Sequence, residues 1–92
     1  MPTRLELYFL GNTAAGRAAL ANAQRLCPDS LRGTRELVAL DLANSPLAGA
    51  EAGVLVTPTL LCRDERGERR VFGDLADLAA VARALGLEAP TL

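Results

Sequence analysis

Two blocks at the start of the chain predict a strand followed by a helix. Residues 5–10 form a short apolar run, with Glu6 as its one polar member, and Gly11 breaks the run at once. Such a run is typical of an interior strand. Residues 14–26 are mostly Ala, Leu, Arg and Gln, which are strong helix formers, and Thr13 is placed to cap their first turn.

The predicted helix has one buried face. Small and apolar residues recur along it at steps of three or four, at Gly16, Leu20, Ala23 and Leu26. We expect the last three to form the buried stripe, with Gly16 allowing another element to approach closely. Pro28 then ends the helix, because the residue before a proline is pushed out of helical geometry.

The middle of the chain predicts a second strand and a short helix. Residues 34–42, whose apolar content comes from Leu37, Val38, Leu40 and Leu42, predict the strand and follow a loop at 29–33. Ser45 followed by Pro46 is a helix start signal, and it predicts a short helix over 46–52 that ends at Gly53.

The last third predicts a hairpin and a final helix. Residues 54–62 form a β-rich apolar run, 63–68 a polar hairpin loop, and 69–72 the return strand. Because proline cannot donate to a sheet ladder, Pro58 should lie at the first residues of its strand. An apolar stripe from 75 to 85 then predicts a helix, with Gly86 as its C-cap.

The element order is therefore βαβαββα. One βαβ unit gives two parallel strands and the hairpin adds two antiparallel ones, so the fold class is α/β with a four-stranded mixed sheet and helices on both faces. This is the thioredoxin-like arrangement. Pro58 occupies the place where that fold has a cis-proline ahead of its third strand, so it is our structural cis-proline candidate.

Composition and charge exclude several classes of function. The chain has 92 residues, a length that predicts a single domain over 1–92. Its net charge of −1 gives no strong electrostatic attraction to nucleic acid, so we expect no nucleic-acid partner. It contains no histidine and no lysine, which excludes imidazole metal sites, Ser-His or Cys-His nucleophiles and Schiff-base chemistry. Neither a membrane span nor a secretory signal is evident, so we expect a cytoplasmic location and no membrane partner.

The two cysteines are poor candidates for catalysis. Cys27 and Cys62 form no CxxC motif, and without an export signal we expect two reduced thiols rather than a disulfide, which spacing alone does not exclude. A thioredoxin-like enzyme keeps its reactive thiol at the start of the first helix, where this chain reads Gly11-Asn12-Thr13-Ala14. The sequence predicts a binding module without catalytic, metal or cofactor residues.

Three further residue clusters can each be interpreted in two ways. Residues 11–13 are a tight turn with a cap or an anion cradle at a helix N-terminus. Asp74 and Asp77 are helix-start acids or paired catalytic carboxylates, and the helix dipole explains them without catalysis. Arginines and acids intermix over residues 63–70, where they form a solvated hairpin surface or a protein-binding patch.

Several blocks resemble the KaiB family of circadian clock proteins. Residues 7–13, Leu-Tyr-Phe-Leu-Gly-Asn-Thr, are similar to the family's LYVAGNT opening. Asp41 with Pro46, then Thr57-Pro58-Thr59-Leu60, then Gly73-Asp74-Leu75 are similar to later family segments, in the same order and at matching distances.

The resemblance implies a non-catalytic module that docks on a KaiC-type, RecA-like ATPase, with a KaiA-like protein as a further partner. It also implies fold switching between a monomeric thioredoxin-like state and a ground state, often tetrameric, with a rearranged C-terminal half. The alternative function is a sensor or regulatory module of a histidine kinase pathway. Because a flexible Gly67 turn replaces the family's proline-rich one, we expect the thioredoxin-like state to be favoured.

The resemblance also implies partner-binding residues. Arg69 matches a basic position near the family's partner face, and Arg17 lies one position from the family's first-helix arginine. Arg35 stands where relatives have an aromatic residue, three positions before Val38, which replaces a family lysine. We expect the partner to contact Arg17, Arg35, Glu36 and Arg69.

Overall fold

The computed structural model describes residues 3–26 and 35–87, and its elements follow the predicted order. The strands are β1 (Thr3–Phe9), β2 (Arg35–Asp41), β3 (Thr59–Asp64) and β4 (Gly67–Phe72). The helices are α1 (Ala14–Leu26), α2 (Pro46–Glu51) and α3 (Leu78–Leu85). The expectations about Cys27 and the 29–33 loop fall outside the described residues.

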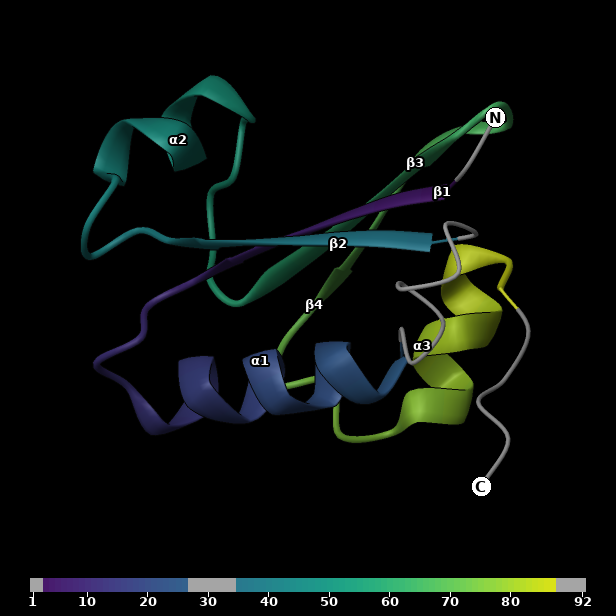
Figure 1. The fold of residues 1–92 in the computed structure, drawn as a ribbon, viewed down its shortest axis with the longest axis horizontal. Helices are drawn as coiled ribbons and strands as arrows, with labels where there is room; N and C mark the ends of the chain where they lie inside the picture. Colours follow the sequence, from purple (N-terminus) through teal and green to yellow (C-terminus); the bar gives the residue numbers. More distant parts are fainter. Residues whose placement is uncertain (1–2, 27–34, 88–92) are drawn as a thin grey trace.

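The four strands form one mixed sheet in the order β2-β1-β3-β4. β1 runs parallel to β2 and antiparallel to β3, and β3 pairs antiparallel with β4. Figure 1 shows α1 and α3 together on one side of the sheet and α2 on the other. This is the predicted thioredoxin-like α/β architecture, and the Thr57–Pro58 peptide is cis as expected.

The core lies between the sheet and the pair α1 and α3. Alternate residues of β1, namely Leu5, Leu7 and Phe9, point into it and are buried. β3 adds Leu60 and Cys62, and the two helices add Ala19, Ala23, Leu26, Val81, Ala82 and Leu85. Leu20 only borders this core, so the predicted stripe of α1 was placed slightly wrong: Ala19 takes the buried position instead.

Residues at the start of α1 behave as the sequence predicts. The Thr13 hydroxyl oxygen accepts a hydrogen bond from the Gly16 amide at 3.0 Å, which satisfies one of the free amides of the first turn. A Cβ on Gly16 would collide with the Leu10 carbonyl, so this glycine does permit a close approach, by the end of β1.

The third strand begins beside Pro58, as the sequence predicts, and leaves out the first residues of the apolar run over 54–62. Pairing of β3 starts at Thr59, opposite Tyr8, and residues 54–58 lie outside the sheet. Leu55 is 95% exposed and Val56 is also exposed, so this apolar stretch is not part of the core. β1 supplies no pairing partner beyond Tyr8 on this side, and a β-branched run without a partner does not form a strand.

Two other boundaries also differ from the prediction. The hairpin turn contains only Glu65 and Arg66, because polar residues on either side of it join β3 and β4. Leu75 is buried but precedes α3, with a φ of 64°. Its three-residue spacing from Leu78 imitates a helical stripe, whereas the helix starts only after its N-cap, Asp77.

The helices cover the two faces of the sheet unequally, which the prediction of helices on both faces did not anticipate. α2 covers only part of its face, and Phe72 there is 60% exposed. We call this side of the sheet, which carries Arg4, Glu6, Tyr8, Glu36, Arg63, Glu68 and Arg70, the open face.

Candidate functional site

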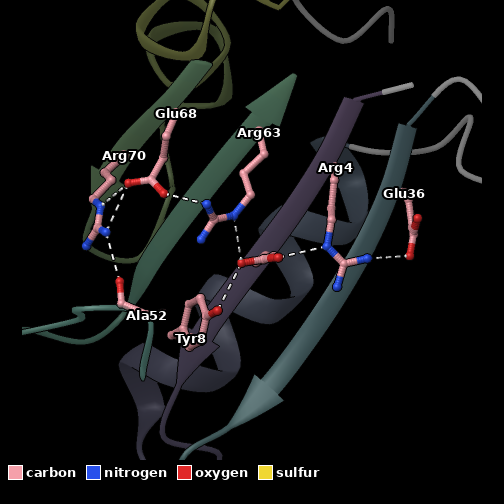
Figure 2. A network of polar contacts seen from close by, with 8 residues as sticks. Arg4, Tyr8, Glu36, Ala52, Arg63, Glu68 and Arg70 are labelled. Carbon is pink, nitrogen blue, oxygen red and sulfur yellow. Dashed lines mark hydrogen bonds and ion pairs between the residues drawn. The ribbon is translucent and has the colours of Figure 1, made fainter. Parts of the chain in front are cut away.

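A network of polar side chains crosses all four strands on the open face (Figure 2). Its centre is Glu6 of β1, whose carboxylate accepts hydrogen bonds from Arg4 Nε at 2.7 Å and from the Tyr8 hydroxyl at 2.9 Å. Arg63 Nε of β3 donates to the same carboxylate at 3.3 Å. Arg4 also pairs with Glu36 of β2 at 2.8 Å, so the network joins the first three strands.

The network continues to β4 and to α2. Arg63 Nη1 lies 2.7 Å from a Glu68 oxygen, and Glu68 in turn binds Arg70 at 3.0 Å. Arg70 donates to the backbone carbonyls of Ala52 at 2.9 Å and Gly53 at 3.0 Å. A guanidinium at the last carbonyls of a helix is favourable because those groups lack partners within the helix. Arg70 therefore fixes the end of α2 to the sheet.

Burial and hydrogen bonding act in opposite directions on Glu6. The side chain is only 11% exposed, and this burial alone would raise the pKa of its carboxyl. The hydrogen bonds from Arg4, Tyr8 and Arg63 together outweigh burial, so the pKa of Glu6 is lowered from its ordinary 4.5. Burial and the neighbouring carboxylate raise the pKa of Tyr8, which stays a hydrogen-bond donor.

The lowered pKa of Glu6 predicts a dependence of stability on acid. Below the ordinary value of 4.5 the unfolded Glu6 binds a proton that the folded one does not. The contribution of Glu6 is thus complete at neutral pH and is lost as pH falls toward the folded pKa. We expect Glu6→Gln to be less stable at pH 7 by about 1–3 kcal/mol and to lose less stability than the native chain between about pH 5 and pH 3. Urea denaturation at these pH values measures the effect; parallel curves for the two proteins would contradict it.

A second polar cluster lies at the other side of the same hairpin, against the end of α3. Asp64 accepts hydrogen bonds from Arg69 at 2.8 Å and from Arg66 at 3.1 Å. Arg69 also donates to the Leu85 carbonyl at 2.8 Å, and Arg66 donates to that of Gly86 at 3.0 Å. The hydrogen bond from Arg69 holds the pKa of Asp64 far below its ordinary 3.8. These contacts tie the hairpin to the C-terminus of α3.

Strand alternation therefore separates the mixed-charge run of residues 63–70. Arg63, Glu68 and Arg70 lie on the open face, and Asp64 and Arg69 lie on the helix face. Both groups of charges are paired rather than free. The described part of the run is a set of cross-strand and helix-capping contacts, and this arrangement depends on the register of the hairpin.

The position of a thioredoxin thiol holds no sulfur. At the end of β1, the Asp41 carboxylate accepts hydrogen bonds from the amides of Gly11 and Ala43, each at 3.0 Å. One interpretation of residues 11–13 was a cradle for a bound anion. The carboxylate of Asp41, from the chain itself, binds the Gly11 amide there instead. Cys62 is a free thiol with no exposed surface, and burial raises its pKa despite the nearby Arg69, which leaves it protonated at neutral pH.

The carboxylates of Asp74 and Asp77 both bind backbone amides at or before the start of α3. The Asp77 side chain caps α3 by accepting from the Ala80 amide at 3.1 Å, and Asp74 accepts from the Ala76 amide at 3.0 Å. They precede the helix rather than lying in its first turn. No group of three metal-binding side chains is found among residues 3–26 and 35–87, and no helix of this described part is long and apolar enough to cross a membrane.

The four residues expected to bind a partner are not gathered at one place. Arg17 is exposed near the start of α1, where Nη1 lies 3.5 Å from the Gly11 carbonyl. Glu36 is on the open face in the ion pair with Arg4. Arg69 is on the helix face, held by Asp64 and α3. Arg35 is the first residue of β2, opposite Thr3. Their role in binding stays a prediction.

Sequence reasoning missed the centre of the open-face network. The signal was present in β1, where Arg4, Glu6 and Tyr8 alternate with core residues in the two-residue period of a strand. From the sequence, Glu6 was interpreted only as the one polar residue of an apolar interior strand. Its partner Arg63 lies 57 positions away and could be found only from the strand register.

Comparison with known proteins supports both the fold and the family. No family model matches the chain. The chain is 31% identical over 84 residues to circadian clock protein KaiB3 of Synechocystis sp., a match that covers 91% of this chain and 80% of that protein.

Solved structures show the same fold at low sequence identity. Thioredoxin of Fasciola hepatica matches with a TM-score of 0.73 and 15% identity, over 92% of this chain and 79% of that one. The N-terminal domain of Synechococcus elongatus SasA matches with a TM-score of 0.64 and 19% identity, over 100% of this chain and 90% of that one. Together with the match to KaiB3, these observations show that the chain is a thioredoxin-like member of the KaiB family of circadian clock proteins.

Proposed function

We propose that this chain is a non-catalytic adaptor that docks, in its thioredoxin-like state, on a KaiC-type ATPase. The observation that carries the proposal is the similarity to KaiB3 over 91% of the chain. The start of α1 supports it, because a thiol-exchange enzyme of this fold needs a cysteine where this chain has residues 11–14 without one. The proposal includes one domain over residues 1–92, a cytoplasmic location and a KaiA-like protein as a further partner.

The thioredoxin-like state is the one in which the C-terminal half forms β3, β4 and α3. Contacts specific to this arrangement are the ion pair between Asp64 and Arg69 and the hydrogen bond from Arg69 to the Leu85 carbonyl. They support a monomer whose resting fold already resembles the docking form. A tetrameric ground state with a rearranged C-terminal half would have to break them.

Co-purification with a KaiC-type hexamer tests the proposal. We expect a stable complex on size-exclusion chromatography in the presence of ATP or ADP. If no complex forms with ATP, with ADP or without nucleotide, the proposal is overturned.

An insulin-reduction assay is the complementary test, and we expect no activity above buffer. Turnover that disappears in a Cys27→Ala, Cys62→Ala variant would show an enzyme rather than an adaptor.

Single substitutions test the expected contact residues. We expect Arg17→Ala, Arg35→Ala and Glu36→Ala each to weaken the complex by about twofold to fivefold, the range of one exposed ion pair. Arg25→Ala is the matched control, since Arg25 is an exposed arginine of the same helix as Arg17. At Arg69 the substitution is lysine rather than alanine, because Arg69 also holds α3 in place. Equal affinities for all variants would remove these residues from the interface.

A second candidate is a sensor or regulatory module of a histidine kinase pathway. The observation that favours it is the match of the whole chain to the N-terminal domain of SasA, a domain of this fold within another protein. Pull-down with the kinase in place of the KaiC-type hexamer distinguishes the two. A complex with the kinase alone would favour this candidate.

A further inference from the structure

The outer edge of β4 has backbone groups without partners. β3 and β4 are antiparallel, and the Gly73 amide donates to the Pro58 carbonyl at 2.9 Å just beyond the last strand pair. Hydrogen-bonded and non-hydrogen-bonded pairs alternate along an antiparallel ladder. The amides and carbonyls of Glu68, Arg70 and Phe72 therefore point away from β3. Within the described residues, β4 is the last strand of the sheet on this side, and no strand pairs with this edge.

A groove runs beside this edge on the helix side. Its walls are the end of β4, at Val71 and Phe72, and the first turns of α3 with the segment that leads to it. The helix contributes small apolar side chains, namely Ala80, Val81 and Ala84. The side chains of a strand added to β4 would point alternately toward this groove and toward the open face.

The groove is acidic. Asp74 and Asp77 line it, and each carboxylate accepts a backbone amide but forms no ion pair with an arginine of the described residues. The nearby hairpin arginines bind other carboxylates, as Arg69 binds Asp64 and Arg70 binds Glu68. Within the described residues, these two carboxylates have no cationic side chain as a partner, unlike the carboxylates of the two hairpin clusters.

We propose that the β4 edge and this groove bind an extended peptide segment that carries a basic residue two positions from a small apolar one, so that both side chains face the groove. The peptide adds a fifth strand by hydrogen bonds to Glu68, Arg70 and Phe72, places an apolar side chain over Ala80 and Ala84, and brings its ammonium or guanidinium group to the two carboxylates. A second copy of β4 fits less well, because its cations are already paired.

The test is an NMR titration of the ¹⁵N-labelled chain with a synthetic peptide, acetyl-Thr-Lys-Thr-Val-Thr-Lys-Thr-amide, whose lysines and valine share one face of a strand. A matched peptide has glutamate at both lysine positions. We expect the largest amide shifts at residues 68, 70 and 72 and along the groove, and a dissociation constant about threefold to tenfold smaller for the lysine peptide. Equal affinity of the two peptides, or shifts confined to the β2 edge, would overturn the proposal.

Variants separate the backbone contact from the charge. Phe72→Pro removes one outward amide at a position where an edge strand tolerates proline, and Phe72→Ala is its control, which keeps that amide. We expect the proline variant to bind the peptide about fivefold more weakly than the alanine variant. The double variant Asp74→Asn, Asp77→Asn keeps the N-cap of α3 and should abolish the preference for lysine.

These variants also distinguish the proposal from self-association. Unchanged preference for lysine in the double asparagine variant would overturn the proposal even if Phe72→Pro fails to fold. Concentration-dependent shifts at residues 68–72 without peptide would assign this edge to a second copy instead, and so would also overturn it. The test needs no KaiC-type protein, so its result is independent of the proposed function.

Discussion

Replacing Leu7 by alanine should lower the free energy of unfolding by about 2–5 kcal/mol. Leu7 lies in β1, a central strand, and has no exposed surface. Its side chain belongs to the core between the sheet and the pair α1 and α3, where the surrounding elements can collapse only partly into the space it leaves. Urea denaturation followed by circular dichroism measures the change.

Leu55→Ala is the matched control for this prediction. It removes the same atoms from a side chain that is 95% exposed, so the stability should change by no more than about 0.5 kcal/mol. Similar losses in both variants would show that residues 54–58 are part of the core. That result would contradict a sheet in which this strand begins only at Thr59.

Replacing Gly16 by alanine should lower the free energy of unfolding by about 1–3 kcal/mol, although alanine is the better helix former. A Cβ at this position would collide with the carbonyl of Leu10 and come within 2.9 Å of the Thr13 hydroxyl oxygen. The Leu10 carbonyl is backbone at the end of β1, so relief requires movement of the strand end or of the helix start.

Gly49→Ala in α2 is the control for the effect of helix propensity. There the nearest atom to a new Cβ is a terminal methyl of Leu42, at 2.9 Å, and a flexible side chain can turn away. We expect the free energy of unfolding to stay within about 1 kcal/mol of the native value, because the higher helix propensity of alanine favours the variant. A Gly16→Ala variant as stable as the native chain would show that α1 does not approach β1 this closely.

How well the sequence predicted each element depended on how local its causes are. The bounds of α1 were predicted without error, because a capping threonine and a run of strong helix formers are both local signals. The start of β3 beside Pro58 was predicted because proline lacks an amide for the sheet ladder, whereas the position of Tyr8 as the last partner in β1 depends on strand register. Leu75 was assigned to α3 because spacing cannot show that its backbone leaves helical geometry.

The candidate site was predictable only in part for the same reason. The absence of sulfur at residues 11–14 can be read directly from the sequence, and it is the reason that thiol chemistry is not expected at the start of α1. The contacts of Arg63 with Glu6 and of Arg70 with the end of α2 depend on strand register and helix placement. A run of charged residues in the sequence shows which side chains can form ion pairs, but it does not show with which residues they pair.

The paired charges on the two faces of the hairpin hold two different helices. On the open face, Arg70 fixes α2 to β4, and on the helix face Arg69 fixes α3 to the hairpin. Both contacts require β3 and β4 to be paired in the observed register. They therefore stabilise the thioredoxin-like arrangement of the C-terminal half, on which the proposed docking depends.

The most direct test of this account is NMR of the isotopically labelled chain, free and bound to an unlabelled KaiC-type hexamer with nucleotide. The account predicts strand chemical shifts over residues 59–64 and 67–72 and helical shifts over 78–85, unchanged in the complex, with bound-state signals that saturate as hexamer is added. Helical shifts over 59–72 in the bound chain, or spectra that hexamer leaves unaffected, would contradict it.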